Sequence, residues 1–264
     1  MTDQAPPSLD ILAIAAHRDD VEQTCGGTLL RAAQHGQRTG ILDLTQGEMG
    51  TRGSAEDRAR EAADAAKILG ANWRRALDIP DGRVENTWEN RLKVAAVIRE
   101  TRPRVVILPY WQGRHPDHYT TSVLGYEACF LAGLRKLALS SQLPGGNESI
   151  PGGKTGSPPK DTLAPHRPFK IIYATLYYDV RPTFVVDISD QFEGKFNSIM
   201  AYKSQFSDQE AGKDLFPAHD EIRARVDSMA RYYGALAGVK YGEPFLQKEV
   251  ALVDDLLAIP VKSI

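Results

Sequence analysis

The chain has 264 residues, of which 42% are hydrophobic and 25% are charged, and this composition is ordinary for a globular protein with a buried core. Its 32 Lys and Arg residues nearly balance its 34 Asp and Glu residues, so the net charge of −2 does not indicate a nucleic-acid or membrane surface. The first ten residues lack the regions of a signal peptide, no apolar stretch approaches the roughly 20 residues that span a bilayer, and two cysteines do not suggest a disulfide scaffold. We therefore expect a soluble, cytoplasmic protein.

The first half of the chain alternates between strand and helix patterns. The apolar run 11–16 predicts a strand buried on both faces, a helix follows over about 21–34, and residues 39–45 predict the next strand. The segment "SAEDRAREAADAAKILG" predicts a helix with Ser54 as its N-cap, Asp57 three residues later and Gly70 as its end.

A further helix is expected over about 87–101, followed by a third core strand at 104–108. Strands that alternate with helices at these spacings indicate right-handed crossovers and a parallel sheet with helices packed on it. The sequence therefore predicts an α/β fold.

The second half begins with a segment of different composition. Residues 140–168 are rich in Gly, Pro and Ser and show no periodic pattern, which is typical of a functional or disordered loop. Strand patterns resume at "KIIYATLYY" and "TFVVDI", then Ser189 or Asp190 is expected to cap a helix ending near Tyr202, and a last helix covers "DEIRARVDSMARYYGALAG". We therefore expect one domain over 1–264, with an insertion at about 140–165.

Polar side chains follow each of the three core strands. His17, Asp19 and Asp20 come after the first strand, "GEMGTRG" (47–53) after the second, and "LPYWQGRHPDH" (108–118) after the third. Because ligands bind outside the carboxyl ends of parallel strands, we expect these segments to meet at one edge of the sheet.

The first and third of these segments also have a simpler interpretation. Asp19 or Asp20 is a suitable helix N-cap, with Glu22 or Gln23 completing a capping box, and "RHPDH" suits an exposed turn. Against this, His17, Asp20 and the distant His118 form a set of two histidines and one carboxylate with open coordination positions, as in a catalytic zinc site. The placement of these residues after core strands favours a metal site.

The segment "AHRDDVEQTCGGTL" closely resembles the AHPDDxE signature of the LmbE/PIG-L-type zinc N-deacetylases, and "HPDH" resembles their second signature. The similarity continues through "GEMGTRGSAEDR", "LDIPDGRVEN" and "FVVDISDQFEGKFNSIMAYKSQF" to "RARVDSMARYYGALAGVKYGEPF". Within the family these segments look like the bacillithiol-pathway enzymes, which remove acetate from N-acetylglucosaminyl malate. The resemblance implies a Rossmann-like α/β sandwich, often assembled as a hexamer.

The resemblance also implies roles for individual residues. His17, Asp20 and His118 become the ligands of Zn²⁺, with Fe²⁺ as an alternative in the cell. Asp19 becomes the general base that deprotonates the attacking water, and His115 lies near the reacting carbonyl as an acid or as a stabiliser of the oxyanion. These roles agree with the needs of amide hydrolysis, which are an activated water, a stabilised oxyanion and a protonated leaving amine.

Several further residues are weaker candidates. Arg52 and Arg114 could bind an anionic part of the substrate or simply brace loops, and Glu48 could hold its loop or contact sugar hydroxyls. Tyr202 matches a family tyrosine that reaches the active site, although by itself it suits a position at the edge of the core. Arg18 stands where the family has proline, and Asp117 could orient one of the histidines or shape the turn.

We expect a metal-dependent deacetylase of a small-molecule N-acetyl sugar, without nucleic-acid or membrane partners. A deacetylase of another N-acetyl sugar, a thiol-conjugate amidase and a catalytically weak sugar-binding homologue are the alternatives. A nucleotide-binding oxidoreductase is disfavoured, because the turn after the first strand is "AAHRDD" and not G-x-G-x-x-G.

Overall fold

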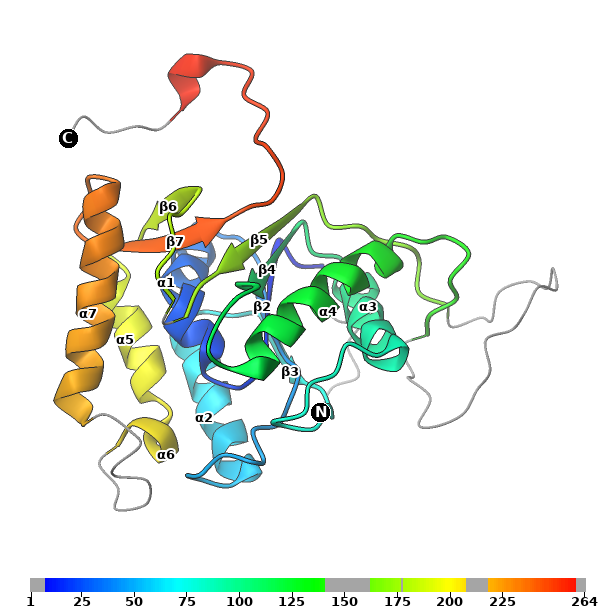
Figure 1. Cartoon of the computed structure of the whole chain (residues 1–264), viewed down its shortest axis with the longest axis horizontal. Helices are drawn as coiled ribbons and strands as arrows, with labels where there is room; N and C mark the ends of the chain where they lie inside the picture. Colours follow the sequence, from blue (N-terminus) through cyan, green and yellow to red (C-terminus); the bar gives the residue numbers. More distant parts are fainter. Residues whose placement is uncertain (1–7, 141–161, 177, 208–217, 260–264) are drawn as a thin grey trace.

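A mixed β-sheet forms the centre of the protein in a computed structural model that describes residues 8–140, 162–176, 178–207 and 218–259 (Figure 1). In these residues the sheet has seven strands in the order β3-β2-β1-β4-β5-β7-β6. The strands are β1 (Ile11–Ala15), β2 (Thr39–Asp43), β3 (Trp73–Ala76), β4 (Val105–Pro109), β5 (Lys170–Ala174), β6 (Phe184–Asp187) and β7 (Gly242–Leu246). The first five run parallel, whereas β7 pairs antiparallel with both β5 and β6.

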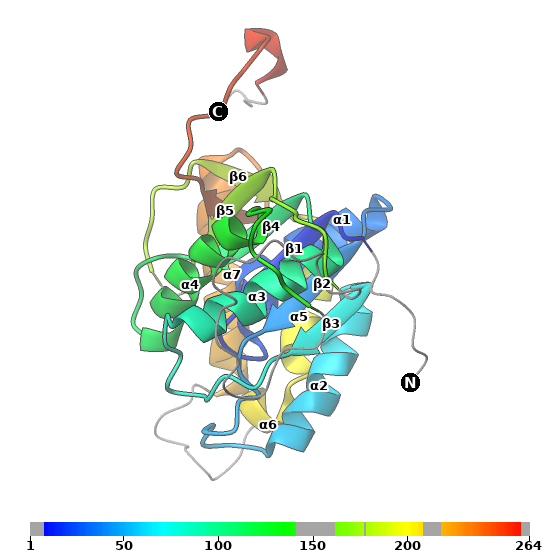
Figure 2. The ribbon, with the colours of Figure 1, turned by 90° about the vertical axis from the view of Figure 1, so that its right-hand side faces the viewer.

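Helices cover both faces of this sheet (Figure 2). They are α1 (Asp20–Gln34), α2 (Ala55–Ile68), α3 (Trp88–Thr101), α4 (Pro116–Ala132), α5 (Phe192–Met200), α6 (Lys203–Phe206) and α7 (His219–Leu236), with a 3₁₀ turn at Leu256–Ala258. Helices α3 and α4 pack together on one face, and α1, α2 and α5 pack on the other. The predicted α/β sandwich is confirmed.

The alternating side chains of β1 divide the core in two. Leu12 and Ile14 belong to the apolar cluster under α3 and α4, whereas Ala13 and Ala15 belong to the cluster under α1. A strand with apolar residues on both faces has to be covered on both, which explains why residues 11–16 form an uninterrupted apolar run.

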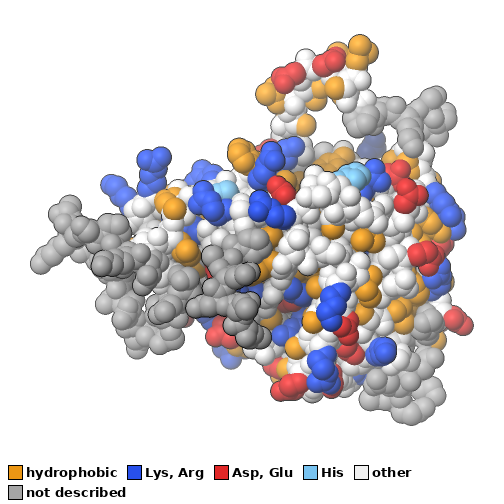
Figure 3. Space-filling view, turned by 180° about the vertical axis from the view of Figure 1, so that it is seen from behind, with side chains coloured by type: hydrophobic (Ala, Val, Ile, Leu, Met, Phe, Trp, Pro, Cys, Tyr) orange, Lys and Arg blue, Asp and Glu red, His pale blue; other side chains and the backbone are white. Residues whose placement is uncertain are grey.

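Beyond the core, the surface carries charges of both signs. On the face seen in Figure 3, Lys and Arg side chains share the surface with Asp and Glu side chains. No helix among the described residues has the length and apolar composition of a membrane span. Both cysteines, Cys25 and Cys129, are buried and unpaired.

The predicted elements of the first half agree with the structure, and the helix cap at Ser54 is a complete capping box with Asp57. Besides the short α6 and the 3₁₀ turn, the elements β3, α4 and β7 were not predicted. The sequence of β3, "WRRA", has no apolar run, and β7, "GEPFL", contains Gly and Pro, so neither matches a strand pattern. In α4 the apolar residues are spread around the helix, so periodicity did not reveal it.

One predicted boundary needs correction. The helix expected after Ser189 or Asp190 begins at Phe192, and its N-cap position is Gln191, without a side-chain cap. Asp187 instead accepts hydrogen bonds from the amide and hydroxyl of Ser189, so the polar residues there form a turn. Most of the expected insertion (141–161) lies outside the described residues, and Ser140 and Thr162 on either side of it form a β-bridge.

Candidate active site at the strand ends

The candidate site lies where β1 and β4 separate. These two strands pair only as far as Ala13 and Ile107, after which β1 stays with β2, and β4 stays with β5. Helices α1 and α4, which follow the two strands, lie on opposite faces of the sheet. A crevice of this kind is the usual ligand site of an open α/β sheet.

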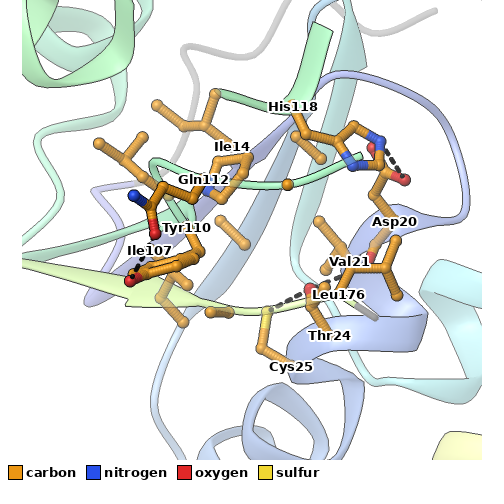
Figure 4. A pocket seen from close by; sticks show the side chains of 16 residues that line it. Ile14, Asp20, Val21, Thr24, Cys25, Ile107, Tyr110, Gln112, His118 and Leu176 are labelled. Atoms are coloured by element: carbon orange, nitrogen blue, oxygen red, sulfur yellow. Dashed lines mark hydrogen bonds and ion pairs between the residues drawn. The ribbon is translucent and has the colours of Figure 1, made fainter. Parts of the chain in front are cut away.

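His17, Asp20 and His118 converge at this crevice (Figure 4 draws Asp20 and His118). His17 Nδ1 lies 3.2 Å from His118 Nε2 and 3.4 Å from Asp20 Oδ2, and His118 Nε2 lies 3.2 Å from Asp20 Oδ1. Three ligands of a tetrahedral ion with bonds of about 2.1 Å lie about 3.4 Å apart. The two imidazole nitrogens and the carboxylate, which meets each of them with a different oxygen, are therefore spaced like the ligands of one divalent ion, and the residues fit the expected metal.

Two carboxylates contact the other nitrogen of the His17 ring. Its Nε2 lies 3.1 Å from Asp81 and 3.3 Å from Asp117. A nitrogen between two carboxylates keeps its proton, so Nδ1, which faces Asp20 and His118, is the nitrogen that would lose its proton to bind an ion. Asp117 thus contacts a histidine, as one of its two interpretations predicted.

Backbone amides of the loops after β2 and β3 fix these two carboxylates. The amides of Gly82 and Val84 donate to Asp117, and the amide of Met49 donates to Asp81. Sequence reasoning gave Asp81 no role, because β3 was not recognised as a strand and its following loop was not expected at this edge.

The electrostatics of the cluster favour a cation. Burial lowers the pKa of His17, but the charge of Asp20 and hydrogen bonds to Asp117, Asp20 and Asp81 outweigh it and raise this pKa to about 12. Burial raises the pKa of Asp20, but the charges of His118 and His17 outweigh it and hold the pKa well below the usual range. The cluster therefore retains positive charge, which a metal ion would supply in place of protons.

Asp19 lies beside this cluster on a strained backbone. Its φ of 116° is in the left-handed region, which a residue other than glycine adopts at a cost of about 1–3 kcal/mol. Its side chain caps no helix amide, so the capping interpretation is wrong; Oδ1 instead lies 3.3 Å from an Arg58 nitrogen. Burial raises the pKa of Asp19 to about 7, although the charge of Arg58 opposes this shift. Such a pKa suits a general base at neutral pH.

Arg58 from α2 was missed by sequence reasoning. Its guanidinium also donates to the carbonyl of Arg18, so it holds the loop that carries Asp19 from two sides. The side chain of Arg18, at the family's proline position, points to α2, where it donates to the carbonyl of Ala55 at 2.8 Å.

His115 is the N-cap residue of α4 and is exposed. Its Nδ1 accepts a hydrogen bond from the amide of Asp117 at 3.2 Å, which leaves the proton of the neutral ring on Nε2. Partial burial and the positive charges of His17 and His118 lower its pKa. A neutral ring with an Nε2 proton can donate a hydrogen bond to a substrate oxygen.

The remaining candidates lie further from the metal ligands. Tyr202 is fully buried, and its hydroxyl donates to Glu22 at 3.1 Å. Arg52 is buried and donates to the carbonyl oxygens of Gln205 and Ser207.

The two other rim candidates are exposed. Glu48 accepts a hydrogen bond from the amide of Asp81, so it holds its own loop to the loop after β3. Arg114 precedes His115 and is exposed at the edge of the site. Contact of Arg52, Arg114, Glu48 or Tyr202 with substrate stays a prediction.

Comparison with known proteins identifies the family. The family model "PIG-L: GlcNAc-PI de-N-acetylase" matches residues 12–129, which include every proposed metal ligand. Diacetylchitobiose deacetylase of Thermococcus kodakarensis is 32% identical over 244 residues, which cover 88% of this chain and 80% of that protein. The chain belongs to the PIG-L family. The family recognised in the sequence is therefore confirmed.

The chain is also similar to proteins with other descriptions. The conserved protein TT1542 from Thermus thermophilus is 38% identical, with a TM-score of 0.75 over 93% of this chain and 98% of that one. The 4-oxalmesaconate hydratase of Pseudomonas putida is 27% identical over 216 residues, 75% of each chain. Membership of the PIG-L family and the similarity to diacetylchitobiose deacetylase indicate a deacetylase.

Proposed function

We propose that this PIG-L protein is a metal-dependent hydrolase that removes acetate from an N-acetylglucosaminide, with Zn²⁺ as its ion and Fe²⁺ as an alternative in the cell. The observation that carries the proposal is the spacing of the His17, Asp20 and His118 side chains, which suits the ligands of one ion, next to an Asp19 side chain that is 14% exposed. An ion held there would supply Lewis-acid charge for the carbonyl oxygen and lower the pKa of the attacking water.

The residues of the chain supply the proton transfers. Asp19 accepts the proton of the attacking water, and Arg58 keeps its carboxylate in place. His115 donates the hydrogen bond of its Nε2 proton to the carbonyl oxygen as negative charge develops there. The leaving amine takes its proton from Asp19 or from His115.

The specific substrate that we propose is N-acetylglucosaminyl malate of the bacillithiol pathway, cleaved in the cytoplasm. The proposal rests on the resemblance of the motifs and on the two candidate arginines, Arg52 and Arg114, since a malate carboxylate needs a cationic partner. Arg114 is the more accessible of the two, while the Arg52 guanidinium is used in loop contacts. A deacetylase of another N-acetyl sugar is the alternative, supported by the similarity to diacetylchitobiose deacetylase.

An acetate-release assay tests both the deacetylase activity and the proposed malate substrate. Metal-loaded enzyme is given N-acetylglucosaminyl malate, N-acetylglucosamine and diacetylchitobiose, and kcat/KM is measured for each. We expect the malate conjugate to be preferred by about 10- to 150-fold, the value of one charge-assisted contact. Equal rates on all three substrates would contradict the malate assignment alone. Absence of acetate from every substrate would contradict the deacetylase.

We further propose that copies of the chain assemble, as the family resemblance predicts for a hexamer. Helix α4 supports this, because Tyr119, Val123, Tyr126 and Phe130 form one stripe at helical spacing and are 39–55% exposed. Phe130→Asp should lower the mass measured by light scattering, and an unchanged mass would exclude this stripe as the contact.

A further inference from the structure

Two neighbouring cavities meet at a thin wall beside the metal ligands. The first lies in the crevice between β1 and β4 and is bounded at one end by Asp20 and His118 (Figure 4). The second lies between α1, α5, α7 and β7. Thr24 and Leu176 line both cavities, so these two side chains stand between them.

The two wall residues differ in how firmly they are held. Thr24 is in α1, and its hydroxyl donates to the Asp20 carbonyl at 2.8 Å, which ties it to the helix backbone. Leu176 follows β5 and is half-buried, with only an apolar side chain to contribute. Shortening Leu176 therefore joins the cavities without disturbing the metal ligands.

The first cavity suits the acyl side of the substrate. Its lining is mostly apolar and includes Ala15, Val21 and Ala174, whereas the exposed His115 and Arg114 lie at the edge of the site. An acetamide whose carbonyl lies at the metal ligands has a small apolar methyl on one side and a large polar sugar on the other. The methyl group matches the apolar cavity, and the sugar matches the exposed edge.

We propose that Leu176, supported by Thr24, closes the acyl end of the site and restricts this enzyme to acetyl groups, an inference that rests on the proposed deacetylase function. The space behind the wall is lined partly by apolar residues of α7, among them Val226, Met229 and Ala230. A longer acyl chain extends into this space once the Leu176 side chain is shortened.

The test compares acyl lengths in wild type and Leu176→Ala. Each metal-loaded protein is given N-acetyl-, N-propionyl- and N-butyrylglucosamine, and kcat/KM is measured for each. One methylene changes selectivity by about 10- to 200-fold in an apolar pocket. Wild type should favour acetyl over butyryl by at least about 10-fold, and Leu176→Ala should abolish most of that preference. Met229→Ala, which changes only the second cavity, is the matched control and should keep it.

Binding of free carboxylates gives a readout that does not depend on turnover. By calorimetry, Leu176→Ala should bind butyrate at least about 10-fold more tightly than wild type does, with acetate binding and metal content unchanged. If Leu176→Ala does not fold, Leu176→Val should show the same shift for propionate.

A variant that keeps its metal and the wild-type selectivity for acetyl would overturn the proposal. A wild type that releases acetate but hydrolyses butyryl equally well would overturn it too, while the deacetylase assignment would stand. A wild type that releases no acid from any substrate would overturn both.

Discussion

Two clusters of buried charge lie close together in this protein, and they differ in what neutralises them. Beneath the site, the guanidinium of Arg74 lies between Glu22 and Asp43, with contacts of 2.6 and 2.8 Å, and all three side chains are at most 10% exposed. At the site, His17, Asp20 and His118 direct their donor atoms toward one another. The first cluster contains its own cation, whereas the second has an arrangement that an ion completes.

This difference separates a structural network from a site of chemistry. Buried charges that are paired within the protein act mainly on stability, because removal of one partner leaves another unpaired. Ligand atoms held at the spacing of a metal ion act on binding and catalysis instead. Substitutions in the two clusters should therefore differ in whether they change metal binding and turnover or stability.

Removal of a metal ligand should have the largest effect. His118→Ala should lose most of the bound metal and at least about 10³-fold in kcat, because charge stabilisation and the activated water are lost together. Elemental analysis and acetate release measure the two effects. His35→Ala, which changes an exposed histidine after α1, is the control and should keep both. Full zinc retention in His118→Ala would exclude His118 as a ligand.

Substitution of Asp19 should separate chemistry from metal binding. Asp19→Asn should retain the metal and lose about 10²- to 10⁴-fold in kcat, the scale of a general base. A base works only when deprotonated, so wild-type kcat should fall as the pH drops through the pKa of Asp19. That pKa is about 7 without an ion and lower beside a bound cation. The acidic limb should be absent from Asp19→Asn; near-normal turnover in this variant would remove Asp19 from the mechanism.

Disruption of the Arg74 network should act on stability. Arg74→Met leaves Glu22 and Asp43 buried without their cation, so the free energy of unfolding should fall by about 3–5 kcal/mol. Urea denaturation measures this loss, and metal content in the folded protein should stay at the wild-type level. Loss of metal from a protein that is otherwise equally stable would show that the two clusters are not separate.

The smallest effect is expected for Tyr202→Phe. This change removes the hydroxyl that donates to Glu22, and the free energy of unfolding should fall by about 1–3 kcal/mol, as for a hydrogen bond to a charged group. The family resemblance predicts a role for this tyrosine at the carbonyl. Turnover that drops by about 10-fold or more at unchanged stability would support that catalytic role over the structural one.

Much of the site could be predicted from the sequence because its residues follow strands. The apolar run before His17 placed three polar side chains at a strand end, and His118 follows another core strand in the same way. Asp81 and Arg58 could not be found like this. Asp81 follows β3, a short strand with two arginines. Arg58 lies within α2, on a turn that faces the site only after this helix packs on the sheet.

By itself the sequence determined the α/β alternation, the strand ends that carry chemistry and the donor types for a metal. Local sequence patterns are sufficient to predict these features, because strand and helix periodicity and helix capping depend on residues that are close in the sequence. The tertiary structure decided which nitrogen of His17 faces Asp20 and His118. It also placed the side chains of Tyr202 and Arg52 in hydrogen bonds within the protein, and Leu176 between two cavities. Each of these depends on contacts between segments far apart in the chain, such as His17 and His118 at 101 positions' separation, which no local pattern specifies.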